Sequence, residues 1–247
     1  TATLTPTTGG NPQTGLLCVI DVAGGTYTDA AGNLNLSSGF FKWTFDDVAP
    51  TLSGVSIASD NSTTTLAKPG DDITLTFTAS ETIQTNPTVT FQSGGAAITD
   101  NTIVYTNTTG NTWTAVYTAN ASDTDGAVTF SIAFSDSAGN AGTAVTAVTD
   151  GTSVTFDDIV PTLSSVSIAS NNATTTLAKP GDDVTLTFPA NETIGTPVVT
   201  FQSGSAAIAD TTIVYTNTTG NTWTAVYTAN ASDTDGAVTF SIEIGRA

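Results

Sequence analysis

Carboxylates are the side chains in this sequence with the greatest capacity for chemistry. The chain carries 22 Asp and Glu against four Lys and Arg, for a formal net charge of −18, and it has no His and a single Cys. Without His the chain lacks the usual general base, the Ser-His-Asp triad and the commonest ligand of transition metals. Carboxylates gathered in loops are suited instead to Ca²⁺, which takes about six to eight oxygen ligands.

Paired carboxylates can also hydrolyse glycosides, and the sequence offers two such pairs, Asp71 with Asp72 and Asp123 with Asp125. Both pairs lie in predicted turns that occur twice in the chain, and nothing in the sequence indicates a cleft around them. The run from Asp123 to Gly126 is faintly similar to the start of an EF-hand loop, but the glutamate needed near position twelve is missing. The sequence therefore predicts that the protein is not an enzyme.

The segments that must position the acids have the pattern of β-strands. Apolar residues alternate with polar residues or Thr in 72–79, 87–93, 102–107, 111–119 and 126–134. Turn-forming Gly, Pro, Asn and Asp residues separate these segments. The spacing predicts an all-β fold, made of tandem immunoglobulin-like antiparallel β-sandwich domains. Trp113 and Trp223, at equivalent positions, are predicted to lie in the cores between the sheets.

A long internal repeat sets the predicted domain boundaries. Residues 102–132 recur without change at 212–242, and the sequence that begins at Pro50 returns with few changes from Pro161. A repeat of about 110 residues is a whole domain rather than one rung of a solenoid. The predicted domains are residues 1–48, the closing half of an Ig-like domain; residues 49–158, a complete domain; and residues 159–247, a second copy that lacks its last strand.

The strand order predicts which acids meet. Successive loops of a sandwich alternate between its two ends, so Glu81, the loop 135–140 and the linker at Asp46 should share one end of the first complete domain. We therefore expect calcium at both domain junctions. The predicted ligands are Asp46, Asp47, Glu81, Asp136 and Asn140 at the first junction, and Asp157, Asp158 and Glu192 at the second. The alternative is that these acids cap local turns, face water and serve solubility.

Several motifs resemble a known family. VAGGTYTDAAGN at 22–33, SDSAGNAG at 135–142 and the two FDD-x-x-P junctions resemble the bacterial Ig-like (cadherin-like) tandem repeats of large secreted adhesins and surface proteins. The resemblance covers essentially the whole chain. It implies seven-stranded sandwiches stacked in tandem, secretion or display at the cell surface, and often calcium between domains; it rarely implies catalysis.

These observations favour a structural role. The leading hypothesis is a non-catalytic extension region of a bacterial cell-surface or extracellular protein, such as an adhesin stalk or a surface lattice or filament, stiffened by calcium at its junctions. The alternative is a carbohydrate- or protein-binding Ig-like module. Nucleic acid is not an expected partner because the chain has no basic patch, and membrane insertion is not expected because no apolar run approaches about 18 residues.

The expected partners are neighbouring copies of the chain or adjacent repeats of a longer one. The second copy lacks a counterpart of residues 152–158, whereas residues 39–47 are a closing strand without the front half of a domain. Donation of that strand from one molecule to the next would satisfy both segments and would build a filament head to tail. The alternative is a fragment cut from a longer chain.

Overall fold

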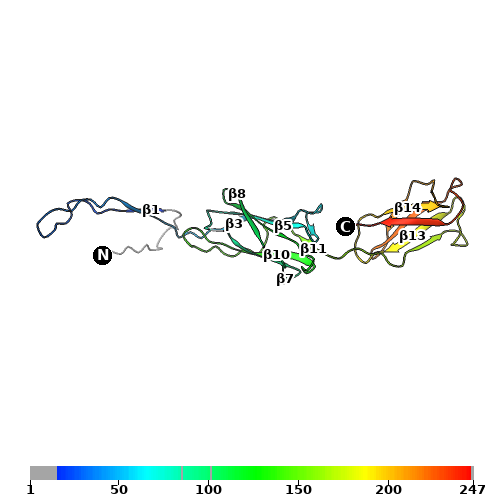
Figure 1. Ribbon diagram of the computed structural model, residues 1–247, viewed down its shortest axis with the longest axis horizontal. Coiled ribbons are helices and arrows are strands. Elements are labelled where there is room, and N and C mark those ends of the chain that lie inside the picture. The colour runs from blue at the N-terminus through cyan, green and yellow to red at the C-terminus, as the bar shows by residue number, and fades with distance from the viewer. Residues whose placement is uncertain (1–15, 85, 101, 246–247) are drawn as a thin grey trace. The chain divides into compact units, whose positions relative to one another are not determined.

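The computed structural model describes residues 16–84, 86–100 and 102–245 (Figure 1). The chain divides into two compact units between Asp158 and Ile159, referred to below as unit 1 and unit 2. The described residues form strands and turns. No helix in that part of the chain is long and apolar enough to span a bilayer.

The described part of unit 1 begins with a two-stranded ladder. β1 (Leu16–Ile20) pairs antiparallel with β2 (Phe41–Phe45), so that Cys18 faces Trp43. The ladder has little core of its own, because most large apolar side chains on it and on the loop between its strands are exposed. They are Leu17, Val19, Ile20, Val22, Tyr27, Leu34, Leu36, Phe40 and Phe41. Residues 1–15 of the predicted half-domain lie outside the described residues.

The rest of unit 1 is a sandwich of two sheets. The first sheet has the order β3-β5-β9-β8 and the second the order β4-β11-β10-β6-β7. The strands are β3 (Leu52–Ser59), β4 (Leu66–Ala67), β5 (Asp72–Ala79), β6 (Thr88–Ser93), β7 (Ala96–Ala97), β8 (Val104–Thr109), β9 (Thr112–Thr118), β10 (Gly126–Ala133) and β11 (Thr155–Phe156). The spatial order β3-β5-β9-β8 corresponds to the sheet A-B-E-D of an Ig sandwich, and β6, β10 and β11 take the places of strands C, F and G in the other sheet. This strand order confirms the predicted fold class.

Period-two alternation explains how these segments build a core. In β5 the side chains of Ile73, Leu75 and Phe77 are fully buried, while the Thr residues between them are half-buried on the other face. In β9 Trp113 and Tyr117 point inward, and the ring of Tyr117 packs 4.7 Å from that of Phe91 in the facing sheet. The prediction that Trp113 is a core residue is confirmed.

Unit 2 repeats most of this sandwich. Its sheets have the orders β12-β13-β17-β16 and β15-β14-β18, and Figure 1 shows β18, in red, beside β14. The strands are β12 (Ser167–Ser170), β13 (Asp183–Pro189), β14 (Val198–Ser203), β15 (Ala206–Ala207), β16 (Val214–Asn217), β17 (Thr222–Thr228) and β18 (Val238–Glu243). Trp223 is half-buried against the core of this unit, so it is less enclosed than Trp113. Among the described residues, unit 2 has no strand equivalent to β4 or β11.

Candidate functional site

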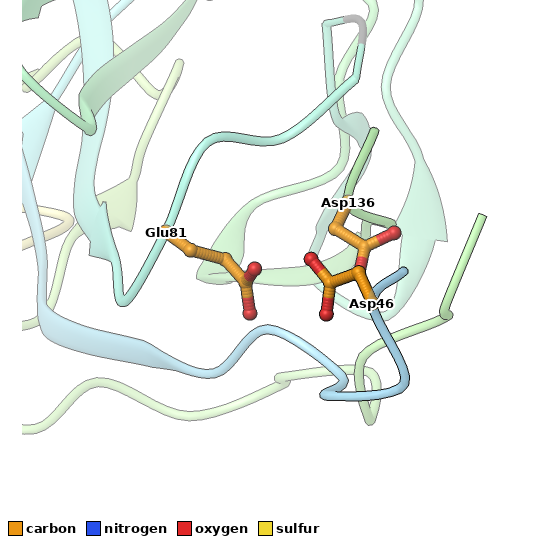
Figure 2. A group of neighbouring side chains, drawn as sticks. All are labelled: Asp46, Glu81 and Asp136. Carbon is orange, nitrogen blue, oxygen red and sulfur yellow. The ribbon is translucent and has the colours of Figure 1, made fainter. Parts of the chain in front are cut away.

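Three loops of unit 1 bring their acids together at one end of the sandwich. Asp46 follows β2, Glu81 follows β5 and Asp136 follows β10. One carboxylate oxygen of each lies within 4.8 Å of those of the other two. Figure 2 shows the three carboxylates turned toward one another. Within the described residues this is the one group of three or more acids, His or Cys with such spacing, and we call it the acidic triad.

Asp136 is held rigidly because its carboxylate organises its own loop. Its Oδ1 accepts hydrogen bonds from the N–H groups of Ala138, Gly139 and Asn140 at 2.7–2.9 Å, and its Oδ2 accepts one from Asn140 Nδ2 at 2.7 Å. The side chain is 1% exposed. Burial alone would raise the pKa of Asp136, but the hydrogen bonds from Asn140, Gly139 and Ala138 outweigh it and lower the pKa below its ordinary value. Asp136 therefore stays ionised.

The same turn forms at the other D-x-A-G-N sequence. Asp29 Oδ1 accepts hydrogen bonds from the N–H groups of Ala31 and Asn33 at 2.8 and 2.9 Å, and Asn33 Nδ2 donates to Asp29 Oδ2 at 2.9 Å. The motif thus encodes a turn built around an aspartate and clamped by an asparagine. Asp29 belongs to no group of three acids in the described part of the chain. What distinguishes Asp136 is therefore its neighbours rather than its turn.

Glu81 is the member of the acidic triad whose pKa is raised. Burial raises the pKa of Glu81, and the negative charges of Asp46 and then Asp136 raise it further. Neither of the two ion pairs found among the described residues involves a member of the triad, since Lys68 pairs with Asp71 and Lys179 with Asp182. The cluster therefore gathers negative charge without a described lysine or arginine partner.

The remaining predicted ligands of the first junction lie close to the triad but differ in role. Asn140 Nδ2 donates hydrogen bonds to Asp136 Oδ2 and, at 3.1 Å, to the backbone carbonyl of Asp46. The amide thereby ties the linker to the loop that follows β10. Asp47 is half-buried and does not belong to the triad.

The predicted ligands of the second junction are divided between the two units. Asp157 and Asp158 are half-buried at the end of unit 1, where the N–H of Asp158 donates to Asp125 Oδ1 at 2.8 Å. Glu192 is half-buried in unit 2. The structure gives each of them a place within its own unit, and a second junction site stays a prediction.

The acids at the opposite end of the sandwich behave as turn aspartates. Asp71 accepts hydrogen bonds from Asn61 Nδ2 and from the backbone and side chain of Lys68. Asp123 accepts them from the N–H groups of Thr99 and Asn120. Both aspartates are buried, at 7% and 6% exposure. The repeated K-P-G-D-D and N-A-S-D sequences, each ending a turn on an aspartate, are the signals for these caps.

The triad has the size of a calcium site. Calcium–oxygen distances of about 2.3–2.6 Å allow two oxygens on one ion to lie up to about 5 Å apart. Each member offers a carboxylate, and Asp136 Oδ2 accepts one described hydrogen bond, so it retains a lone pair for a cation. Waters would complete the shell, as is usual for Ca²⁺ sites.

No protein-family model matches the chain, and no curated protein matches it. Among solved structures, the chain is similar to the I-band fragment I67-I69 from titin at 11% identity and a TM-score of 0.40, over 79% of this chain and 64% of that one. It is similar to the tandem Ig repeats of Dlar at 12% identity and a TM-score of 0.27, over 79% and 90%. It is also similar to a marsupial T cell receptor at 14% identity and a TM-score of 0.29, over 81% and 93%. The assignment of the fold rests on the strand order described above.

Proposed function

We propose that this chain is a non-catalytic extension region of a bacterial cell-surface or extracellular protein, in which tandem Ig-like domains act as spacers. We further propose that Ca²⁺ bound by Asp46, Glu81 and Asp136 stiffens the junction before the complete domain. The observation that carries the proposal is which segments supply the three carboxylates of the triad. One carboxylate comes from the linker and two from the domain that the linker enters, within 4.8 Å.

Charge explains how such a site would control the linker. The three carboxylates lie well within the Debye length of about 8 Å at physiological ionic strength, so they repel one another in the absence of a cation. Burial raises the pKa of Glu81, and the repulsion from Asp46 and Asp136 raises it further. A bound cation turns the same groups into ligands and adds a second tie to the one that Asn140 makes with the carbonyl of Asp46.

The rest of the molecule supports a spacer. Buried acids such as Asp71 and Asp123 hold turns. The facing surfaces of the sheets in unit 1 are closed by apolar side chains. Near-identical duplication of a domain adds length, whereas it adds little to a catalytic site. Secretion or display at the cell surface is part of the proposal, because millimolar extracellular calcium suits a weak site.

Calcium titration tests the proposal. We expect a dissociation constant of about 10⁻⁴–10⁻³ M by calorimetry, typical of extracellular modules. At about 100 times that concentration one ion should stabilise unit 1 by about 2.7 kcal/mol. Small-angle scattering should then report a narrower distribution of dimensions. The Glu81→Gln variant should lose most of this response.

The matched control is Glu243→Gln, which removes the same charge from an exposed position on β18. It should respond to calcium as the unmodified chain does. Equal responses of the two variants, or no effect of millimolar calcium on unfolding or dimensions, would contradict the calcium site. Specific binding on a glycan array would instead contradict the spacer role.

A further inference from the structure

Unit 2 contains an open groove of about 430 Å³. It runs between residues 175–180 on one side and the turn 233–237 with the start of β18 on the other. Its apolar lining includes Ile168, Leu177, Ala178, Val184, Tyr227 and Val238. All of its walls belong to unit 2.

The corresponding place in unit 1 is filled by β11. This strand pairs antiparallel with β10 and parallel with β4. Thr155 and Asp157 donate backbone hydrogen bonds to the carbonyls of Thr65 and Ala67, each at 2.9 Å, and the carbonyl of Val154 accepts one from Val128. The side chains of Val154 and Phe156 are 1% exposed. The groove thus has the form of a slot for a strand with apolar residues at alternate positions.

Residues that the β11 segment covers in unit 1 are more exposed at the equivalent positions of unit 2. Ile57 is 3% exposed in unit 1, but its counterpart Ile168 is 37% exposed in unit 2. Ala67 is buried, whereas its counterpart Ala178 is exposed. In unit 1 the segment that precedes β11 also covers β3, where the hydroxyl of Thr152 accepts a hydrogen bond from the N–H of Ile57. A complete filling therefore needs about a dozen residues that end in a strand.

We propose that residues 34–47 of a second copy of this chain occupy the groove, with Trp43, Thr44 and Phe45 inserted as the missing strand. The sequence WTFDD at 43–47 matches VTFDD at 154–158 in four of five positions. The residues before it include Leu34, Leu36 and Phe40, which are exposed in their own unit. Apolar surface is thus exposed on both the donor and the acceptor, which is unusual for a surface that stays in water.

Unit 1 also supplies the register. Because Phe156 faces Gly126 and Thr155 faces Ala127, Phe45 takes its place opposite Gly236, and Thr44 opposite Ala237. The N–H of Thr44 then meets the carbonyl of Thr176, as that of Thr155 meets Thr65. The N–H of Asp47 meets Asp235 Oδ1, as that of Asp158 meets Asp125.

Insertion requires β2 to exchange β1 for the groove. A two-stranded ladder is marginal in water. On β2 Phe41 is 63% exposed and Trp43 and Phe45 are half-buried, so pairing with β1 leaves part of the apolar surface of the strand in water. In the groove both edges of the strand find backbone partners and its apolar side chains leave water. Because donor and acceptor are different surfaces of one chain, the contact does not close and the copies assemble head to tail.

Sedimentation of the full chain tests the proposal with two variants and their mixture. Phe45→Asp damages the donor, and Ala178→Arg fills the groove at a position where the side chain is exposed. The unmodified chain should form a concentration-dependent series of multiples of 24.9 kDa. Each variant alone should stay monomeric, and an equal mixture should give dimers and no larger species. Tyr27→Asp and Ala207→Arg, at exposed positions outside donor and groove, should assemble as the unmodified chain does.

A peptide of residues 151–158 serves as a competitor that carries the strand of unit 1. It should dissociate the assemblies into monomers, and a peptide with Asp at positions 154 and 156 should not. Assembly that survives both variants overturns the proposal. A chain that stays monomeric at millimolar concentration also overturns the proposal. If the peptide nevertheless binds such a chain, the groove accepts a strand from another source; if the peptide does not bind, the groove accepts no strand.

Discussion

The two units contain the same side chains in different surroundings. Residues 102–132 and 212–242 are identical, yet Phe130 is 8% exposed in unit 1 and Phe240 is 40% exposed in unit 2. The facing partner is the same in both units, since Phe130 lies opposite Phe91 and Phe240 opposite Phe201. What differs is the covering segment that ends in β11. The burial of this phenylalanine is therefore set by residues distant in sequence, not by the strand that carries it.

The residue types at two turns separate the units a second time. Gly54 and Gly95 of unit 1 have positive φ angles of 58° and 82°, and the equivalent positions of unit 2 hold Ser165 at 51° and Ser205 at 69°. Positive φ suits glycine and strains other residues. The second copy therefore keeps the turns of the first with residues that are less suited to them.

The largest expected effect in this comparison comes from truncating the shared phenylalanine. Phe130→Ala should destabilise unit 1 by about 3–5 kcal/mol, because it empties a packed core. Phe240→Ala should cost unit 2 about 1–2 kcal/mol at low protein concentration, because much of that ring already faces water. Hydrogen exchange can follow each unit through peptides over β5 and β13, whose sequences differ.

Equal costs at low concentration would mean that Phe240 is as enclosed as Phe130, and the contrast between the units would fail. A cost for Phe240→Ala that grows with protein concentration would sharpen the contrast. It would show that association covers the ring.

Alternation predicted the long strands well. The segment 72–79 is β5 to the residue, and the predictions for the strands around Phe91, Trp113 and Phe130 are within one or two residues of the structure. The two-residue strands β4 and β7 escaped the pattern, because so short a segment has no period, whereas β11 lies inside the closing strand predicted at 152–158. They form where the backbone of another segment offers partners, which a local pattern does not report.

The acidic triad could be predicted from loop order alone, since loops at one end of a sandwich must lie near one another. The role of Asn140 could not, because an amide carries both donors and an acceptor and its orientation depends on its neighbours. In the structure the amide nitrogen of Asn140 donates hydrogen bonds to the backbone carbonyl of Asp46 and to the carboxylate of Asp136. Asp47 lies outside the triad although it adjoins Asp46.

The glycine–serine difference gives a medium-sized test. Ser165→Gly should stabilise unit 2 by about 0.5–1 kcal/mol, because relief of the positive φ exceeds the added freedom of glycine in the unfolded chain. Gly54→Ser should destabilise unit 1 by about 1 kcal/mol, since a side chain there meets open space but strains the backbone. Thermal unfolding of each variant against the unmodified chain measures both changes. A swap that moves both units in the same direction would contradict this account.

The smallest effect concerns Glu81 in unit 1. Its pKa in the folded state lies above the usual 4.5, so its contribution to stability is present below pH 4.5 and is lost as the pH rises through the raised value. In the presence of a chelator, Glu81→Gln should therefore be more stable than the unmodified chain at pH 7, and the advantage should vanish in acid. With saturating calcium at pH 7 the order should reverse, because the variant lacks a ligand. Urea unfolding under the three conditions, with Glu243→Gln as the control, separates the two effects. A variant that is less stable at pH 7 with the chelator would mean that Glu81 is held by favourable contacts rather than repelled by Asp46 and Asp136.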